Sequence, residues 1–133
     1  MGTPTEPDRE LDVLIAEDDA LTRRLLRRIL ESEGYRCAEA ASGDEALDIA
    51  RSSRPRLVLL DVMMPGPDGF HVAQHLHADP ATRDVRVVFL TARNDPQACR
   101  AARRPAGDML LVKPIDTNVL LDALSVVLYN AKP

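Results

Sequence analysis

The chain has 133 residues, a length that suits one domain with a substantial hydrophobic core. Its formal net charge is −4 with 29% charged residues, a balance that argues against broad binding to nucleic acids or membranes. No apolar run reaches the length of about 18 residues that a membrane span needs, and residues 1–10 lack the apolar core of a signal peptide. The two cysteines, Cys37 and Cys99, lie far apart, so we expect reduced thiols in a cytoplasmic protein.

The first part of the chain reads as a leader, a strand and a helix. Residues 1–10 are expected to form a disordered leader, and residues 11–16 are an apolar stretch typical of a strand. A helix is then predicted from an N-cap at Asp19 to Gly34, with its arginines opposite its apolar residues. The apolar residues are Leu21, Leu25, Leu26, Ile29 and Leu30, and the arginines are Arg23, Arg24, Arg27 and Arg28.

Two further strands and a helix follow. Residues 35–40 predict a short edge strand. The next helix begins with a capping box, in which Ser42 is the cap and Glu45 reaches back from the third helical position. Residues 56–61 then form an apolar run that ends in a single carboxylate, Asp61, which suits a strand buried on both faces.

The remaining elements continue the same alternation. Patterns of apolar residues, caps and breakers predict a helix at 69–78, a strand at 85–90, a helix at 97–104, a strand at 109–112 and a helix at 117–129. Five strands alternating with five helices imply parallel βαβ units with right-handed crossovers. The predicted fold class is therefore α/β, with one parallel sheet between layers of helices.

Special residues lie at four of the predicted strand ends. They are Glu17 and Asp18 after the first strand, Asp61, Thr91 and Lys113 after later strands. Because all carboxyl ends of parallel strands lie at one edge of the sheet, these side chains are expected to meet there. Crowded carboxylates repel unless a cation neutralises them, and oxygen ligands without His or Cys favour Mg²⁺ over Zn²⁺. The added hydroxyl and ammonium suit an incoming phosphoryl group on one carboxylate.

Five sequence motifs contain or flank these residues: Val13-Leu14-Ile15-Ala16-Glu17-Asp18-Asp19, Leu59-Leu60-Asp61-Val62-Met63-Met64-Pro65-Gly66, Asp68-Gly69, Leu90-Thr91-Ala92 and Val112-Lys113-Pro114. In these motifs the chain resembles the response-regulator receiver domains, the family of CheY. The resemblance covers residues 11–130 and implies a flavodoxin-like (βα)5 doubly wound sheet of strand order 2-1-3-4-5. It also implies a domain organisation with a leader at 1–10 and a tail at 131–133.

The resemblance assigns roles to the acidic residues. Asp61 would be the phosphoacceptor, whose carboxylate attacks phosphorus. Glu17, Asp18 and Asp61 would hold Mg²⁺, together with the backbone carbonyl of Met63. Glu17 stands where Asp is commoner in the family, and the exchange keeps a carboxylate.

Further roles fall on the last two strand ends. Thr91 would bind the phosphoryl group and shift inward on activation, Lys113 would form an ion pair with it, and the Lys113-Pro114 bond is expected to be cis. The strand position that usually carries an aromatic switch residue holds Leu110, which puts the usual aromatic readout in doubt. Met63 and Arg93 stand at positions that tune the lifetime of the phosphoryl group, and their bulk predicts slow autodephosphorylation.

The expected function is a phosphorylatable signalling domain that catalyses only its own modification. Its partners would be a histidine kinase or phosphotransfer protein, an unknown downstream protein and, on activation, a second copy in a homodimer. No direct contact with nucleic acid or membrane is expected, and the sequence leaves open whether the domain stands alone or comes from a longer regulator or hybrid kinase.

Other interpretations remain. A pseudo-receiver scaffold would bind partners without phosphorylation, and Leu110 keeps this alternative open. A phosphatase of the haloacid-dehalogenase type would need a second Asp where Met63 stands, and a nucleotide binder would need a glycine-rich loop. The arginines of the first helix are either a docking patch for the phosphodonor or a solvated face. His71, His75 and His77 are expected to be surface residues.

Overall fold

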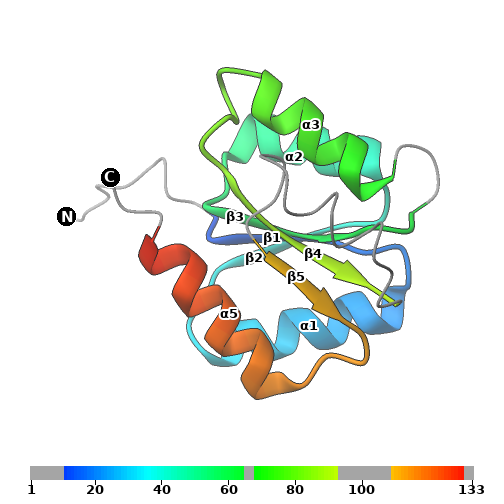
Figure 1. Cartoon of the computed structure of the whole chain (residues 1–133), viewed down its shortest axis with the longest axis vertical. Helices are drawn as coiled ribbons and strands as arrows, with labels where there is room; N and C mark the ends of the chain where they lie inside the picture. The colour runs from blue at the N-terminus through cyan, green and yellow to red at the C-terminus, as the bar shows by residue number, and fades with distance from the viewer. Residues whose placement is uncertain (1–10, 65–67, 93–108, 131–133) are drawn as a thin grey trace.

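Short, uninterrupted apolar runs build the centre of the molecule. The computed structural model describes residues 11–64, 68–92 and 109–130. Five parallel strands form one sheet in the order β2-β1-β3-β4-β5, as predicted (Figure 1). The strands are β1 (Val13–Ala16), β2 (Cys37–Ala40), β3 (Leu57–Asp61), β4 (Arg86–Thr91) and β5 (Met109–Val112).

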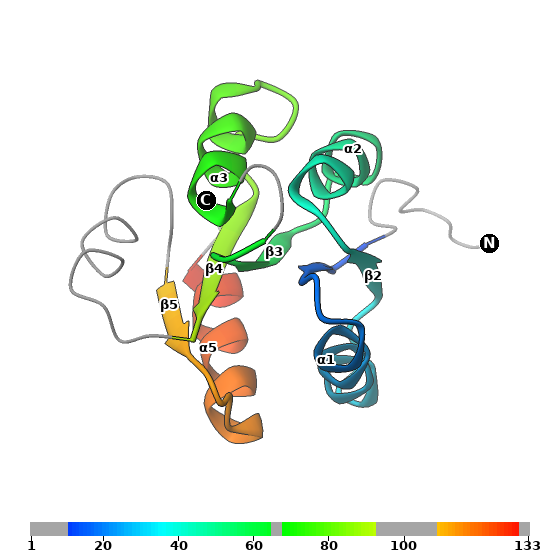
Figure 2. The same cartoon turned by 90° about the vertical axis from the view of Figure 1, so that its right-hand side faces the viewer.

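Helices cover both faces of the sheet. The described helices are α1 (Ala20–Ser32), α2 (Gly43–Ser53), α3 (Gly69–Ala78) and α5 (Thr117–Asn130). Both views place α1 and α5 on one face and α2 and α3 on the other (Figures 1 and 2). The predicted leader at 1–10, helix at 97–104 and tail at 131–133 lie outside the described residues.

Strand β1 and the interiors of β3 and β4 are apolar because both of their faces meet a layer of helices. Leu60 and Phe89 belong to the core cluster beneath α2 and α3, whereas Leu59 and Leu90 belong to the cluster beneath α1 and α5. All four side chains are fully buried. Alternate residues of β3 and β4 thus stabilise opposite halves of the core, which fixes the position of the strand ends.

Local caps determine where the helices begin. Asp19, Ser42 and Asp68 are the N-caps of α1, α2 and α3, and each side chain accepts a hydrogen bond from a backbone N–H of the first turn. The carboxylate of Glu45 accepts a hydrogen bond from the N–H of Ala41 at 2.8 Å. This is one residue before the N–H that a standard capping box would satisfy. Gly34 follows α1 with φ of 93°, a left-handed conformation that glycine adopts without strain.

The simple division of α1 into an apolar and a basic side is wrong. Leu21 and Leu25 are 79% and 58% exposed, and only Leu26 and Leu30 are buried in the core. The side chain of Arg23, in contrast, is only 16% exposed. The face of α1 that packs on the sheet therefore includes fewer of its leucines than the sequence suggests. The side chain of Arg23 lies against the protein instead of in solvent.

One histidine of α3 is not the surface residue that was expected. His71 and His75 are exposed, but His77 is half-buried and its Nε2 lies 3.1 Å from the backbone oxygen of Val85. Its Nδ1 is buried and has no hydrogen-bond partner within the described residues. His77 therefore packs at the junction between α3 and the strand that follows it. None of the helices in the described ranges has the length and hydropathy required to cross a membrane.

We predict that Cys37 is chemically inert in the folded protein. The thiol is buried, and burial raises its pKa to about 12. Because the thiolate is the reactive form, alkylation near neutral pH should be about a thousandfold slower than for a thiol of ordinary pKa. The measurement is a thiol titration of a Cys99→Ser variant before and after unfolding. Rapid modification of the native variant would contradict this prediction.

Candidate functional site

Polar side chains gather at the carboxyl edge of the sheet. Glu17 follows β1, Asp61 ends β3, Thr91 ends β4 and Lys113 follows β5. The parallel register pairs Asp61 with Leu90 and Thr91 with Val112, so that neighbouring strands end at similar levels. The sheet thus brings together residues that are up to 96 positions apart in the sequence.

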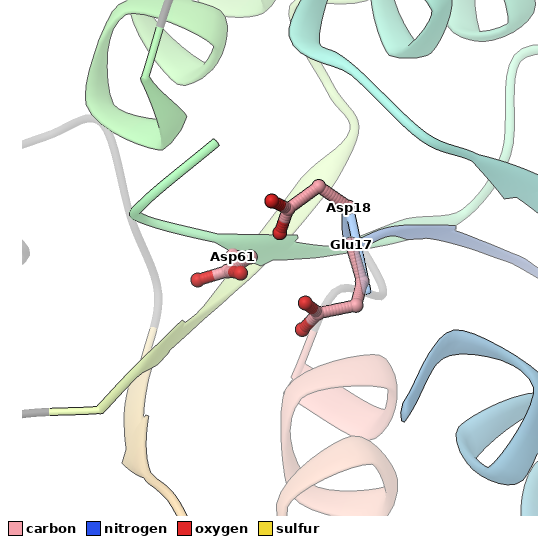
Figure 3. A group of neighbouring side chains, drawn as sticks. All are labelled: Glu17, Asp18 and Asp61. Carbon is pink, nitrogen blue, oxygen red and sulfur yellow. The ribbon is translucent and has the colours of Figure 1, made fainter. Parts of the chain in front are cut away.

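Three carboxylates form the centre of this edge. Glu17, Asp18 and Asp61 offer oxygen atoms that all lie within 4.8 Å of one another (Figure 3). Glu17 is only 1% exposed and Asp61 only 4%, whereas Asp18 is exposed to solvent. Two buried carboxylates at this separation repel each other strongly unless a cation lies near them. The oxygen-only donor set fits a hard divalent cation such as Mg²⁺.

The ammonium of Lys113 supplies positive charge to the buried pair. Its Nζ lies 2.7 Å from Glu17 Oε1 and 3.4 Å from Asp61 Oδ2. Burial alone would lower the pKa of Lys113, but its hydrogen bond to Glu17 and the charge of Asp61 outweigh burial and raise that pKa. Lys113 therefore remains charged and holds the two buried carboxylates together.

Glu17 is held at several points. Burial raises the pKa of its carboxyl group, and the hydrogen bond from Lys113 opposes this effect. The second carboxylate oxygen accepts a hydrogen bond from the N–H of Asp19 at 3.1 Å. Its backbone oxygen accepts one from Arg23 Nη1 at 2.7 Å. The side chain and main chain of Glu17 are thus both fixed at the end of β1.

The loop after Asp61 orients the central carboxylate. The N–H of Met63 donates to Asp61 Oδ1 at 3.1 Å. Gly69, at the start of α3, packs directly on the backbone of this residue. A Cβ atom at Gly69 would lie 2.6 Å from the backbone oxygen of Asp61 and 2.9 Å from Val62 Cα. The absence of a side chain at position 69 lets α3 approach the site closely.

The last two strands contribute Thr91 and the segment around Lys113. Thr91 is 3% exposed, and its backbone oxygen accepts a hydrogen bond from the N–H of Lys113 at 2.7 Å. The Lys113–Pro114 peptide bond is cis. Leu110 is partly buried and packs against the core cluster on the α2 and α3 side. Beside the carboxylates lies a depression lined by Asp18, Val62, Met63, Met64 and Asp68.

The sequence predicted most residues of the site but not the contacts made by Arg23 and Gly69. The structure brings together Glu17, Asp18, Asp61 and Lys113, whereas Arg93 lies outside the described residues. Met63 lies beside the site with 56% of its surface exposed. The contact of Arg23 with Glu17 and the close approach of Gly69 were not predicted. No pattern in the sequence separates Arg23 from the other arginines of α1, but the Asp-Gly step at 68–69 was a usable indication of tight packing.

A parallel sheet between helix layers, with an acidic cluster and a lysine at its carboxyl edge, defines a flavodoxin-like domain with an acidic site at that edge. A family model described as the response regulator receiver domain matches residues 13–125. The chain therefore belongs to the family of response-regulator receiver domains, as its motifs suggested.

Curated relatives agree with this assignment. Transcriptional regulatory protein AfsQ1 of Streptomyces coelicolor is 39% identical over 108 residues, which cover 81% of this chain and 47% of that protein. Transcriptional regulatory protein ResD of Bacillus subtilis is 37% identical over 123 residues, covering 92% of this chain and 50% of that protein. The chain spans about half the length of these relatives.

Solved structures show the same fold. The signal receiver domain of a signal transduction histidine kinase from Syntrophus aciditrophicus is 30% identical, with a TM-score of 0.83 and 92% of each chain covered. Vibrio cholerae chemotaxis protein CheY4 is 27% identical, with a TM-score of 0.83, covering 88% of this chain and 98% of that chain.

The relatives bear on the expected partners. The names of AfsQ1 and ResD describe transcriptional regulatory proteins. The expectation that this protein makes no direct contact with nucleic acid is therefore not supported.

We predict that Gly69→Ala disturbs the site as well as the fold. The new methyl group would meet the backbone of Asp61, and such overpacking typically costs about 1–3 kcal/mol of unfolding free energy. Gly34→Ala is the control, because it strains a positive φ, but no atom of the described residues lies within 4 Å of the added Cβ. Both variants should unfold at lower denaturant concentration, but only Gly69→Ala should also weaken Mg²⁺ binding. Equal Mg²⁺ affinities in the two variants would contradict the prediction.

Proposed function

We propose that this receiver domain accepts a phosphoryl group on Asp61 in a Mg²⁺-dependent reaction with a histidine kinase or phosphotransfer protein. The observation that carries the proposal is the cluster of three carboxylates within 4.8 Å, with Lys113 bridging the two buried ones. A structural ion pair would need only one carboxylate for one ammonium. The excess negative charge is best explained by a cation that binds when the site is in use.

The residues that would hold Mg²⁺ are Glu17, Asp18 and Asp61, with the backbone carbonyl of Met63 as a further ligand. Asp18 is exposed and accessible to an ion from solvent, whereas Glu17 and Asp61 lie beneath it. When bound, the ion would neutralise charge that develops on the phosphoryl oxygens during transfer. Since binding requires ionised ligands, the raised pKa of Glu17 predicts that Mg²⁺ competes with a proton at this carboxyl group.

The transfer itself would use the carboxylate of Asp61 as nucleophile. One of its oxygens forms a bond to phosphorus while the bond between phosphorus and the imidazole nitrogen of the donor breaks, and the electron pair stays on that nitrogen. The Met63 N–H fixes Asp61 Oδ1, which limits rotation of the carboxylate. Lys113, already near Asp61 Oδ2, can pair with the incoming phosphoryl oxygens.

The consequence of phosphorylation would be a change in protein–protein contacts. Thr91 ends β4 beside the site and is proposed to hydrogen-bond to the phosphoryl group. Leu110, on the neighbouring strand, would then respond through packing, because its side chain has no hydroxyl group. The proposed partners are a downstream protein and, on activation, a second copy of the chain. We propose that the folded unit comprises residues 11–130.

A scaffold that is never phosphorylated is the second candidate. The observation in its favour is Leu110, which occupies the switch position without an aromatic ring. This scaffold would bind its partners in one state only. The two candidates differ in a single measurable property, the modification of Asp61.

We predict that acetyl phosphate with Mg²⁺ adds one phosphoryl group to the wild-type chain. Asp61→Asn should abolish the modification because it removes the nucleophile. Removing Mg²⁺ with a chelator should abolish it as well. Asp48→Asn, which changes an exposed Asp on α2, is the matched control and should be modified normally. Intact-mass spectrometry is the measurement. Absence of modification in the wild type under all conditions would favour the scaffold, and persistence in Asp61→Asn would refute the assignment of the phosphoacceptor.

We also predict that the phosphorylated form hydrolyses slowly, over minutes or longer. Met63 lies next to Asp61, and with Arg93 it is proposed to hinder access of water to the phosphoryl group. Met63→Ala should shorten the half-life, which can be followed by intact mass after removal of the phosphodonor. A wild-type half-life of seconds, or an unchanged half-life in the variant, would argue against this role.

A further inference from the structure

We infer that Arg23 is a positioning residue for the metal site, because it fixes the peptide unit that joins Glu17 to Asp18. This inference rests on the proposed function, since it concerns how the proposed Mg²⁺ ligands are held. Arg23 lies in the first turns of α1 and belongs to none of the motifs that identify the family. Its role follows from two contacts of one side chain.

The guanidinium of Arg23 links the end of β1 to the edge strand β2. Its Nη1 donates to the backbone oxygen of Glu17 at 2.7 Å, and its Nε donates to Glu39 Oε1 at 2.9 Å. The side chain is 16% exposed and that of Glu39 is 22% exposed. A planar guanidinium that donates in two directions holds its acceptors in a fixed relative orientation. Arg23 is therefore a rigid connection and not a solvated charge.

The position of the accepted carbonyl explains why this connection matters. The pairing of β1 with β2 and β3 ends at Ala16, so the sheet register does not extend over the carbonyl of Glu17. The N–H of Glu17 still donates to Ala40 at 3.0 Å. Arg23 fixes the other side of the residue, where the chain turns toward Asp18. Because both acidic side chains leave from this short segment, its orientation determines where their oxygens lie (Figure 3).

The charge of Glu39 keeps Arg23 in place. Hydrogen bonds from Arg23 and then Arg27 lower the pKa of Glu39, so it remains a carboxylate at neutral pH. Arg27 donates to Glu39 at 3.0 Å and to Glu31 at 2.9 Å. Arg23 and Arg27 thus share one acceptor on β2, but Arg23 also binds the metal-site backbone. Arg27 is a matched control from the same helix with the same partner.

A purely structural role for Arg23 makes a different prediction. If Arg23 only attached α1 to β2, its loss would lower stability and leave Mg²⁺ affinity unchanged, much as loss of Arg27 would. If it positions the ligands, its loss would weaken Mg²⁺ binding beyond any effect on stability. Groups that orient metal ligands from outside the first coordination sphere typically contribute about 10–100-fold to metal affinity.

The test compares Arg23→Met, Arg23→Lys and Arg27→Met in the full chain. Mg²⁺ dissociation constants are measured by calorimetry, and unfolding free energies are measured without Mg²⁺. We expect Arg23→Met to raise the dissociation constant about tenfold and Arg27→Met to change it by less than about twofold. Arg23→Lys should recover part of the affinity, since an ammonium can reach one of the two acceptors.

A kinetic readout separates ligand positioning from general damage. With acetyl phosphate as donor, Arg23→Met should shift the Mg²⁺ concentration for half-maximal phosphorylation by the same factor as the dissociation constant, and by more than it changes the plateau rate. If Arg23→Met does not fold, Glu39→Gln loosens the same connection and should show a smaller shift in the same direction. Equal Mg²⁺ affinities in the Arg23 and Arg27 variants, with normal binding by the wild type, would overturn this inference alone. Failure of the wild type to bind Mg²⁺ would instead refute the proposed metal site.

Discussion

The buried ion pairs of Lys113 are the interactions on which the carboxyl edge of the sheet depends. Without this ammonium, Glu17 and Asp61 would be two carboxylates that are both almost inaccessible to solvent and close together. Taking such charges out of water costs several kcal/mol per ion, and only close pairing repays this cost. The pairing requires β1, β3 and β5 to end at one level. Because the sheet is buried on both faces, apolar packing holds its strands in register and keeps these three strand ends close together.

The ammonium of Lys113 is not equally close to its two carboxylate partners. Lys113 lies closer to Glu17 than to Asp61, at 2.7 Å against 3.4 Å. If Glu17, Asp18 and Asp61 held a divalent cation, its charge would neutralise Glu17, and the ammonium of Lys113 would be free to pair with phosphoryl oxygens near Asp61. The N–H of Met63 and the close approach of Gly69 hold Asp61 independently of Lys113.

The sequence predicts the parts of this structure that depend on local patterns. Strand β5 has the predicted bounds, the three N-caps are the residues expected, and the acidic residues fall at strand ends. Contacts set by how a helix rotates on the sheet were not predictable in this way. A helical repeat of leucines and arginines cannot tell that Leu21 faces solvent and Arg23 faces the protein. The burial of His77 likewise depends on the turn between α3 and β4, which brings the carbonyl of Val85 to its ring.

The packing around β4 connects the site to the rest of the fold through apolar contacts. Leu110 pairs in register with Phe89, which lies two residues before Thr91 on β4. Phe89 in turn contacts Phe70 of α3, with ring centroids 4.8 Å apart. α3 begins at Gly69, against the backbone of Asp61. Asp61 and Thr91 are therefore both connected to one apolar cluster, one through the start of α3 and the other through β4. Leu110 packs against the same cluster and contributes to it by shape alone, because its side chain has no hydroxyl group.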